Sequence, residues 1–384
     1  MKVAIFTDTY NPQTNGVVAY LNDSLRLLSR KEEVVVFAPG EGRFRREKVS
    51  PNMTVCWIPS SPFPFYEGYR VASMDYKRIS RLLEDEKPDI VHAHAPINLA
   101  LQGVIAAKRK KIPVVITYHT HFPDYVPHLL NGRLPKALAS LSGYTVKKLI
   151  KHVFGMADVV TAPTRELVAE LHSYGLENVV HLPNGIDFSK FRCSEKDVKA
   201  FRNRYGITPG KEVALYLGRI SFEKKIDNLF EAFKEIEKDD RMLVIAGGGP
   251  YLKQFRKFAS ALGLKNVVFT GFLKSSAPAY RSADIFVSAS DSETFGLTFV
   301  EAMHNGVPPI GVRRLGPKEI IKHRKNGLLV KPDDPRALAR AMDLLFEDRK
   351  LRERLGKEAR KASTRYSIEN SVRDTLRIYQ RLVR

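Results

Sequence analysis

The sequence has few cysteines and no long apolar run. Cys56 and Cys193 are the only cysteines in its 384 residues, and they stand far apart, without the spacing of a zinc site. This excludes a disulfide-stapled secreted scaffold and favours a reducing, cytoplasmic compartment. A membrane-spanning helix needs about 18 or more consecutive apolar residues, and no such stretch occurs. The first residues, MKVAIFTDTY, also lack the cleavage site of a signal peptide, so we expect residues 2–7 to be a buried strand.

Acidic residues are outnumbered: 42 Asp and Glu stand against 63 Lys and Arg, which gives a formal net charge of +21. Such an excess suits phosphorylated ligands, an anionic membrane surface or nucleic acid. A basic solvated surface, as in heat-adapted proteins, explains it equally well. Zinc-finger spacing, an aromatic RNP strand and an isolated basic arm are all missing from the sequence, so we expect no nucleic-acid partner.

The length and the alternation of patterns predict two α/β domains. A chain of 384 residues exceeds one ordinary core. In both halves short apolar runs alternate with helical periodicity, which is typical of parallel sheets covered by helices. Residues 183–187, PNGID, break this alternation, and residues 188–211 are charged and are expected to be irregular. We therefore expect a first domain over residues 1–187 and a second over residues 188–365.

The stretch from Asp284 to Val312 carries the clearest signal. Its pattern predicts a strand, a polar loop, a helix and a second strand. The start of the helix would expose the N–H groups of Phe295, Gly296 and Leu297, which together carry roughly half a positive charge. An anion is expected to bind there.

Two glutamates flank that helix terminus. Glu293 precedes it and Glu301 lies eight residues further on, a separation of about 12 Å along a helix at about 1.5 Å per residue. One carboxylate can therefore hold hydroxyls at one end of an elongated, phosphate-containing ligand while the other holds hydroxyls at the far end. Two solvated glutamates on a surface helix are the alternative.

Other candidate residues follow the ends of predicted strands. Arg219 and Lys224 come after the strand 213–217, where two cations can grip a diphosphate. Gly16 lies in the turn between the first strand and the first helix, where a ligand can approach the backbone closely. His119 follows the strand 113–117, at the edge where α/β sheets bind ligands.

A metal site is the alternative for the histidine pair His119 and His121. Nearby carboxylates with zinc-site spacing are missing, so ligand contact or a structural role is preferred for His119. The triplet Asp291-Ser292-Glu293 faintly resembles an Asp-x-Asp metal motif, but Glu293 suits ligand hydroxyls better. We expect no metal.

Two segments have the composition of a membrane-facing surface. Residues 62–71, PFPFYEGYRV, are aromatic and proline-rich and are not expected to form a packed element, and a basic helix follows around residues 77–83. A second basic helix is predicted over residues 135–154. Aromatic residues beside a basic amphipathic helix can lie in a membrane interface, but they can equally cover a core.

With these residues identified, the chain resembles the GT-B glycosyltransferases of the retaining family 4 over essentially its whole length. The motifs occur in the family's order, and they are NGV (15–17), the histidine after TY (His119), PNGID (183–187), G-R-x-x-x-x-K (218–224), GGGP (247–250), GF-L (271–273) and E-x7-E (Glu293, Glu301). The resemblance implies two Rossmann-like domains facing a central cleft, with a C-terminal helix, residues 366–384, packing back on the first domain. Lys225 departs from the family pattern, which usually has Gly after the lysine, so the backbone conformation there is left open.

The resemblance also implies a role for each residue of the E-x7-E stretch. Glu301 would bind the donor ribose, and Glu293 with the amides of Phe295 and Gly296 would hold the donor sugar. The remaining donor-binding positions are Leu297 and, after GF, Leu273.

For the other candidates, the resemblance implies contacts with the phosphates and the reacting centre. Arg219 and Lys224 would bind the diphosphate, and Gly16 would approach the phosphates from the first domain. His119 would lie near the sugar C6 and the reacting centre. The family lacks a dedicated metal site, and retention would come from attack of the acceptor on the leaving-group side, with the β-phosphate as base; no cofactor besides the sugar nucleotide is implied.

Within the family, residues 118–125, YHTHFPDY, and 62–70 are similar to membrane-surface lipid glycosyltransferases, such as diacylglycerol glucosyltransferases and their sulfoquinovosyl and mannosyl relatives. This implies transfer of a hexose, with glucose from UDP-glucose preferred, to a lipid such as diacylglycerol at the inner face of the plasma membrane. UDP- and GDP-sugar donors both stay open, as does a transferase or epimerase for a soluble substrate. A basic nucleic-acid-binding protein on an inactive nucleotide fold is the alternative from another class.

Overall fold

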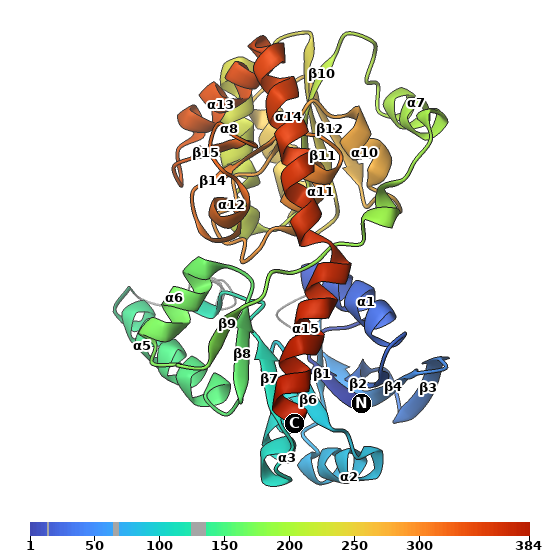
Figure 1. Cartoon of the computed structure of the whole chain (residues 1–384). Coiled ribbons are helices and arrows are strands. Elements are labelled where there is room, and N and C mark those ends of the chain that lie inside the picture. Colours follow the sequence, from blue (N-terminus) through green and yellow to red (C-terminus); the bar gives the residue numbers. More distant parts are fainter. Residues whose placement is uncertain (14, 64–68, 124–135) are drawn as a thin grey trace. The chain divides into compact units, whose positions relative to one another are not determined.

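The computed structural model describes residues 1–13, 15–63, 69–123 and 136–384, and over residues 136–144 it describes the backbone alone. The chain divides into two compact units. Unit 1 comprises Met1–Gly185 together with Ile368–Arg384, and unit 2 comprises Ile186–Ser367 (Figure 1). Of the helices in the described ranges, none has the length and apolar content to cross a membrane.

Unit 1 is built on one sheet. In its described part, the strands are β1 (Lys2–Thr7), β2 (Glu33–Gly40), β3 (Arg45–Ser50), β4 (Met53–Pro62), β5 (Arg70–Ala72), β6 (Ile90–His94), β7 (Val114–Thr117), β8 (Val159–Ala162) and β9 (Val179–His181). Their order is β3-β4-β2-β1-β6-β7-β8-β9, with β5 paired to β4. The pairs that include β3 or β5 are antiparallel and the others are parallel. The connections run in opposite directions from β1 and β6, so ligands are expected at the carboxyl ends of these two strands.

The helices of unit 1 include one from the C-terminus. They are α1 (Gly16–Leu28), α2 (Tyr76–Glu86), α3 (Leu99–Arg109), α5 (Lys136–Phe154), α6 (Arg165–Ser173) and α15 (Ile368–Val383). Helix α15 packs against α1 and β6, and its residues Val372, Leu376 and Tyr379 are buried in the cluster that contains Ile5 and Leu21 (Figure 1). The expectation that the C-terminal helix returns to the first domain is therefore confirmed.

Unit 2 has a parallel sheet with the strand order of a Rossmann fold. Its strands are β10 (Glu212–Leu217), β11 (Arg241–Ala246), β12 (Val267–Gly271), β13 (Ile285–Val287), β14 (Pro309–Val312) and β15 (Leu328–Val330). Their order is β12-β11-β10-β13-β14-β15, with every pair parallel. The direction of the connections changes between β10 and β13, so the carboxyl ends of these strands form the binding edge of unit 2.

Helices cover both faces of this sheet. They are α7 (Glu195–Arg204), α8 (Ile226–Ile236), α9 (Leu252–Ala261), α10 (Ala277–Ser282), α11 (Leu297–His304), α12 (Leu315–Ile320), α13 (Pro335–Glu347) and α14 (Arg349–Ser363), with short 3-10 turns η1 (Phe188–Phe191), η2 (Phe222–Lys224) and η3 (Thr364–Tyr366). Along β10, Ala214 and Tyr216 pack with α8, α9 and α13, whereas Val213 and Leu215 pack with α7, α10 and α11. This alternation follows from the two-residue period of a strand, and it explains why the central strands are apolar on both sides.

Two sequence expectations are wrong in detail. Residues 188–211 are not irregular, because η1 and α7 lie there; α7 begins with a capping box between Ser194 and Asp197, and it buries little besides Val198 and Phe201, so its periodicity was weak. Residues 62–71 were expected to form no packed element, but β4 extends to Pro62 and β5 begins at Arg70 and pairs with it. Residues 64–68 of that segment lie outside the described residues, as do residues 124–125 of YHTHFPDY.

Candidate active site

The two loops at the binding edge of unit 2 are joined by ion pairs. The loop after β10 carries Lys224 and Lys225, and the loop after β13 carries Asp291 and Glu293. Lys224 Nζ lies 2.7 Å from Glu293 Oε1, and Lys225 Nζ lies 2.6 Å from Asp291 Oδ2. The structure therefore brings Lys224 and Glu293, which the sequence assigned to one site, into direct contact.

These pairs change the electrostatics that the sequence alone suggested. The side chains of Lys224 and Glu293 are 19% and 21% exposed, so each neutralises the other in a partly water-excluded place. Both carboxylates of the Asp-x-Glu triplet are thus paired with an ammonium group. In the described part of the chain, no group of three or more His, Cys, Asp or Glu side chains is arranged to hold a metal ion.

The loop before α11 has a sharp turn at Gly296. Its φ of 87° is left-handed, and a Cβ on this residue would meet the Phe299 ring at 2.8 Å. Helix α11 begins at Leu297, and its N-cap residue, Gly296, has no side chain that could cap it. The N–H of Gly316 donates to the carbonyl of Glu293 at 2.8 Å and holds the loop from the next connection. The start of α11 thus presents backbone amides beside the Lys224–Glu293 pair.

Glu301 is held by a residue that the sequence did not single out. The Tyr280 hydroxyl, on α10, donates to Glu301 Oε2 at 2.8 Å and to the carbonyl of Thr298 at 3.3 Å. Burial, and then the charge of Glu301, raise the pKa of Tyr280 well above its usual value, so the hydroxyl stays protonated as a donor. Only Glu301 of the two glutamates is helical, because α11 starts after Glu293. The expected separation of about 12 Å assumed one continuous helix at about 1.5 Å per residue and does not apply.

The glycine-rich turn after β11 packs against the loop that follows β10. A Cβ on Gly247, whose φ is 137°, would lie 1.9 Å from the carbonyl oxygen of Gly218, so only glycine fits. The Tyr216 hydroxyl donates to the carbonyl of Arg219 at 2.9 Å and fixes the backbone of that residue. Arg219 and Lys224 therefore lie in one supported loop, as expected. Leu273, after β12, and Leu297 pack against the same hydrophobic cluster.

Gly16 and His119 belong to unit 1, whereas the other candidates belong to unit 2. Gly16 is the first residue of α1, and the Asn15 side chain caps that helix by accepting the N–H of Val18 at 2.9 Å. The start of α3 is already filled by a carboxylate, because Asp8 accepts the N–H groups of Ile97, Asn98, Leu99 and Ala100. The turn beside Gly16 therefore stays the candidate position for the phosphates in unit 1.

His119 is buried in a row of histidines. Its Nε2 lies 2.8 Å from His94 Nδ1, and His92 Nε2 lies 2.6 Å from the Thr117 hydroxyl. Burial lowers the pKa of His119 and of His92 to about 3 each, so both are neutral at physiological pH. His121, the other histidine of that segment, lies 2.9 Å from Glu170 instead. The signal for His94 was available, because it ends β6 just as His119 follows β7.

Comparison with known proteins identifies the family. The family model described as "Glycosyltransferase Family 4" matches residues 14–190, and that described as "Glycosyl transferases group 1" matches residues 197–362. The alpha-monoglucosyldiacylglycerol synthase of Streptococcus pneumoniae is 34% identical over 322 residues, which cover 81% of this chain and 70% of that protein. A GDP-mannose-dependent alpha-mannosyltransferase of Corynebacterium glutamicum is 29% identical over 339 residues, covering 86% and 76%.

The fold agrees with solved structures. The structure of HepE from Anabaena in complex with UDP-glucose superposes with a TM-score of 0.78 at 19% identity, covering 98% of this chain and 100% of that one. Such a match at low identity supports the GT-B fold. The resemblance drawn from the sequence motifs is confirmed by these matches, and the chain belongs to the GT-B glycosyltransferases of family 4 and group 1.

Proposed function

We propose that this protein is a retaining, metal-independent hexosyltransferase that moves a hexose, with glucose from UDP-glucose preferred, to a lipid acceptor such as diacylglycerol at an anionic membrane surface. The observation that carries the proposal is the pairing of Lys224 with Glu293 beside the start of α11, whose N-cap residue is Gly296, at the binding edge of unit 2. A cation, a carboxylate and open amides are the groups that a sugar diphosphate needs.

Different residues of the site stabilise the leaving group, bind the sugar and bind the ribose. When the bond from the anomeric carbon to the diphosphate breaks, negative charge grows on the leaving group, and Arg219, Lys224 and the amides of Phe295 and Gly296 stabilise it. Glu293 then turns its carboxylate to the sugar hydroxyls, since the diphosphate competes with it for Lys224. Glu301, held by Tyr280, binds the ribose hydroxyls.

Retention requires the acceptor to attack from the side that the diphosphate leaves. A bond forms between the acceptor oxygen and the anomeric carbon as the bond to the diphosphate breaks, and the acceptor proton passes to a β-phosphate oxygen. A double displacement would instead need a carboxylate nucleophile about 5 Å from a partner acid. Glu293 is committed to Lys224 and to the sugar, so we assign no nucleophile, and the diphosphate serves as the base.

The relatives support a choice between two donors and favour a lipid acceptor. The monoglucosyldiacylglycerol synthase is the more similar of the two reported proteins, which favours glucose and diacylglycerol for this chain. The mannosyltransferase favours the second candidate, a transfer of mannose from GDP-mannose. Both candidates use the same diphosphate-binding residues, so they differ only in the base and the sugar.

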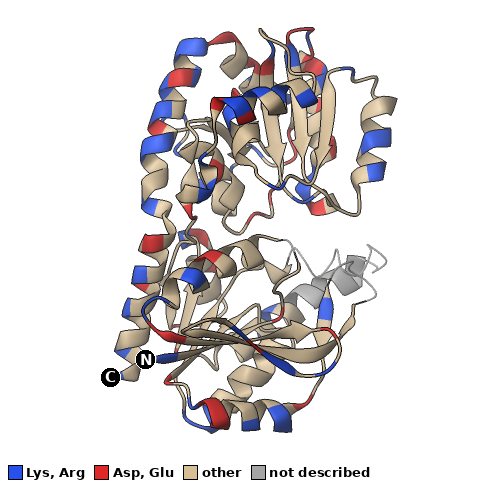
Figure 2. Cartoon of the chain, turned by 90° about the vertical axis from the view of Figure 1, so that its right-hand side faces the viewer, with Lys and Arg blue, Asp and Glu red and all other residues tan. Residues whose placement is uncertain are grey.

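The exposed side of α5 supports the membrane surface. Leu149 is 60% exposed, and the exposed residues Lys148 and His152 are its neighbours around the helix. An exposed apolar residue beside basic side chains suits an anionic lipid interface. Elsewhere, basic residues are spread over many helices, α14 among them, and alternate with acidic ones (Figure 2). Such spreading favours general solvation for much of the net charge.

A donor panel tests the proposal. The full chain is incubated with UDP-glucose, UDP-galactose or GDP-mannose and with vesicles that contain diacylglycerol, and the lipid product is identified by mass spectrometry. Glucosyl- or mannosyl-diacylglycerol with the anomeric configuration of the donor supports the corresponding candidate. Transfer only to water or to a soluble acceptor contradicts the lipid acceptor, and no transfer from any donor contradicts the proposal as a whole.

Co-sedimentation tests the membrane surface separately. The protein is expected to pellet with phosphatidylglycerol vesicles, and Leu149→Ser is expected to weaken this binding. Val49→Ser, which removes a 50% exposed apolar residue from β3, is the control. Equal pelleting of the two variants would exclude α5 as the contact surface.

A further inference from the structure

Unit 2 contains a cavity of about 570 Å³ whose lining residues differ from those of the candidate donor site. Its walls come from η1 and the residues after it, from α10, from the end of α11 and from the last turn of α14. None of its lining residues belongs to the loops that carry Lys224 and Glu293. The volume falls within the range of roughly 300–1,000 Å³ that small-molecule sites occupy.

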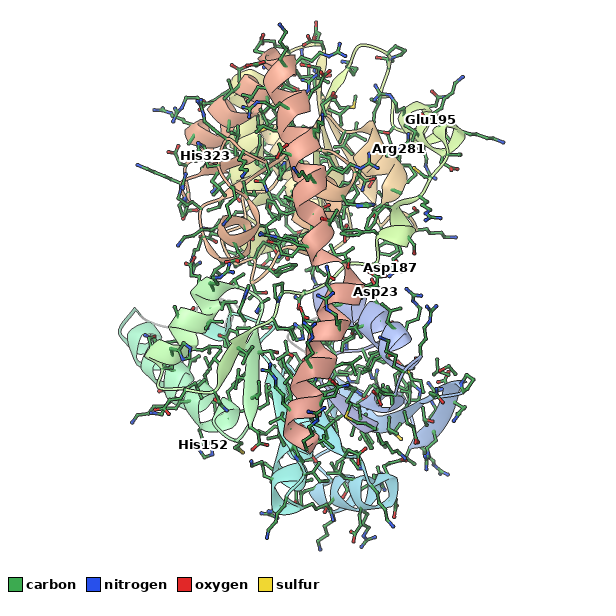
Figure 3. All side chains as sticks on the ribbon, viewed as in Figure 1. Asp23, His152, Asp187, Glu195, Arg281 and His323 are labelled. Atoms are coloured by element: carbon green, nitrogen blue, oxygen red, sulfur yellow. The ribbon has the colours of Figure 1, made fainter. Side chains whose placement is uncertain are left out.

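Three arginines line this cavity. They are Arg192, Arg281 and Arg360, and no acidic side chain is among the described lining residues. Arg281 is held in place, because it forms an ion pair with Glu195 and donates to the carbonyl of Cys193 at 2.8 Å (Figure 3). In the described ranges of the chain, no carboxylate pairs with Arg192 or Arg360. Two guanidinium groups thus face the cavity without an acidic partner.

The negative charges near the cavity do not cancel the positive charge of its three arginines. Helices α11 and α14 end at the cavity, and each C-terminus carries roughly half a negative charge. Glu195 adds one more, and because Glu195 and the three arginines are all exposed, water screens both signs. Three guanidinium charges against these leave the cavity positive, and guanidinium groups match phosphate oxygens through paired hydrogen bonds.

Other residues that line the cavity are suited to the organic group that a phosphate ester carries. The rings of Phe188 and His304 are stacked, with centroids 4.1 Å apart and planes 6° apart, and they form a flat wall. Burial, and then the charge of Arg360, lower the pKa of His304, so this wall is neutral at physiological pH. A flat, neutral surface beside a cluster of guanidinium groups can hold an apolar or ring-containing group next to a phosphate.

We propose that this cavity is a second ligand site, which binds a phosphate monoester or diester through Arg192, Arg281 and Arg360. The phosphate belongs either to a soluble phosphorylated metabolite or to a phospholipid headgroup. Ligand binding would act on both chain connections of unit 2, because η1 follows Ile186, where the chain enters, and α14 precedes Ser367, where it leaves. These connections are bonded to each other, with Ile186 N–H donating to the Tyr366 carbonyl at 2.9 Å.

The chain contains its own reporter for the test. Cys193 lies in the cavity wall and is partly exposed, whereas Cys56, the other cysteine, is fully buried. A thiol reagent therefore modifies Cys193 in the folded protein, and a ligand in the cavity slows that reaction. Cys193→Ser confirms the assignment of the signal. The measurement needs no turnover, so its failure is distinct from a failure of the proposed transferase reaction.

The variant Arg192→Gln/Arg360→Gln is compared with Arg340→Gln/Lys350→Gln. The control pair is exposed, lies in unit 2 away from the cavity and removes the same net charge. The probes are inorganic phosphate, glycerol 3-phosphate, and vesicles of phosphatidylglycerol or phosphatidylcholine, all at ionic strength matched with chloride. We expect saturable protection of Cys193 in the wild type and the control, and binding weaker by about tenfold or more in the cavity variant, since charge-assisted contacts are lost.

The probe arms separate the two sources of phosphate. Protection by glycerol 3-phosphate in solution identifies a soluble ester, and protection only by phosphatidylglycerol vesicles identifies a headgroup. Either result supports the site if Arg192→Gln/Arg360→Gln loses the protection of Cys193 and the control variant keeps it. Absence of protection beyond the chloride control, or equal protection in both double variants, overturns the proposal.

Discussion

The substitution Lys225→Gly is expected to give a more stable protein than Lys225→Ala. Lys225 has a φ of 49° and a ψ of 45°, in the left-handed region. That conformation costs a residue with a Cβ about 1–2 kcal/mol and costs glycine almost nothing. The side chain compensates through its ammonium group, which lies 2.6 Å from Asp291 and 2.7 Å from Asp333.

The magnitude follows from what each substitution removes. Both remove the two ion pairs, which are partly exposed and contribute up to about 1 kcal/mol each. Only the alanine variant keeps the left-handed strain, while glycine loses about 0.5–1 kcal/mol through the greater freedom of its unfolded chain. Glycine should therefore be favoured over alanine by about 0.5–1 kcal/mol, and it should lie closer to the wild type.

Urea denaturation followed by circular dichroism measures this difference. Fluorescence would miss it, because the single tryptophan, Trp57, lies in unit 1. Lys199, an exposed residue in α7, is the matched control, because alanine is favoured over glycine by about 1 kcal/mol inside a helix. If alanine is also the more stable choice at position 225, the left-handed conformation does not carry the cost that we assign to it.

Three further predictions concern the reaction and the histidine row. Lys224→Ala should lower kcat far more than it weakens UDP binding, because charge develops at the transition state; unchanged turnover in single-turnover assays would remove Lys224 from the mechanism. Tyr379→Phe should cost about 1–3 kcal/mol in urea denaturation, since it takes away the hydroxyl that lies 2.5 Å from buried His92. Stability should fall as the pH drops from about 6.5 toward about 3, because folding keeps His92 and His119 neutral, by up to about 1.4 kcal/mol per pH unit for each histidine. Asp8, whose pKa burial raises to about 6, acts in the opposite direction between about pH 6 and pH 4 and reduces the slope; a flat profile in urea titrations over this range would contradict the burial of the histidines.

The fold was predictable because its central strands are short, continuous apolar runs that are easily recognised in the sequence. Runs such as residues 213–217 and 242–246 are buried on both sides and carry no competing pattern, so their alternation with helices indicates parallel sheets. Helix α7 was missed because its ten residues are mostly charged and stabilised by a capping box. Strand β5 was missed because three residues give no period, and only the pairing with β4 makes them a strand.

The site was predictable where a motif coincides with a strand end. The positions of Arg219, Lys224 and Glu293 at one edge of the sheet were predicted in this way, because loops after neighbouring parallel strands meet there. Tyr280 could not be found, because its contact with Glu301 joins two helices through side-chain geometry that no spacing encodes. The family pattern at position 225 did contain structural information: the glycine usual there matches the left-handed backbone that Lys225 adopts.

The two glutamates of the E-x7-E motif are supported by different parts of unit 2. Glu293 precedes the helix and is fixed by Lys224 and, through its carbonyl, by Gly316. Glu301 lies one turn inside α11 and is fixed by Tyr280. The turn at Gly296 separates them, so a disturbance of one support leaves the other intact. A ligand that bridges both carboxylates therefore contacts Glu293, which must exchange its lysine partner, and Glu301, which is already oriented by Tyr280. The cost of binding is then concentrated at the Lys224 end, where we propose that the diphosphate binds.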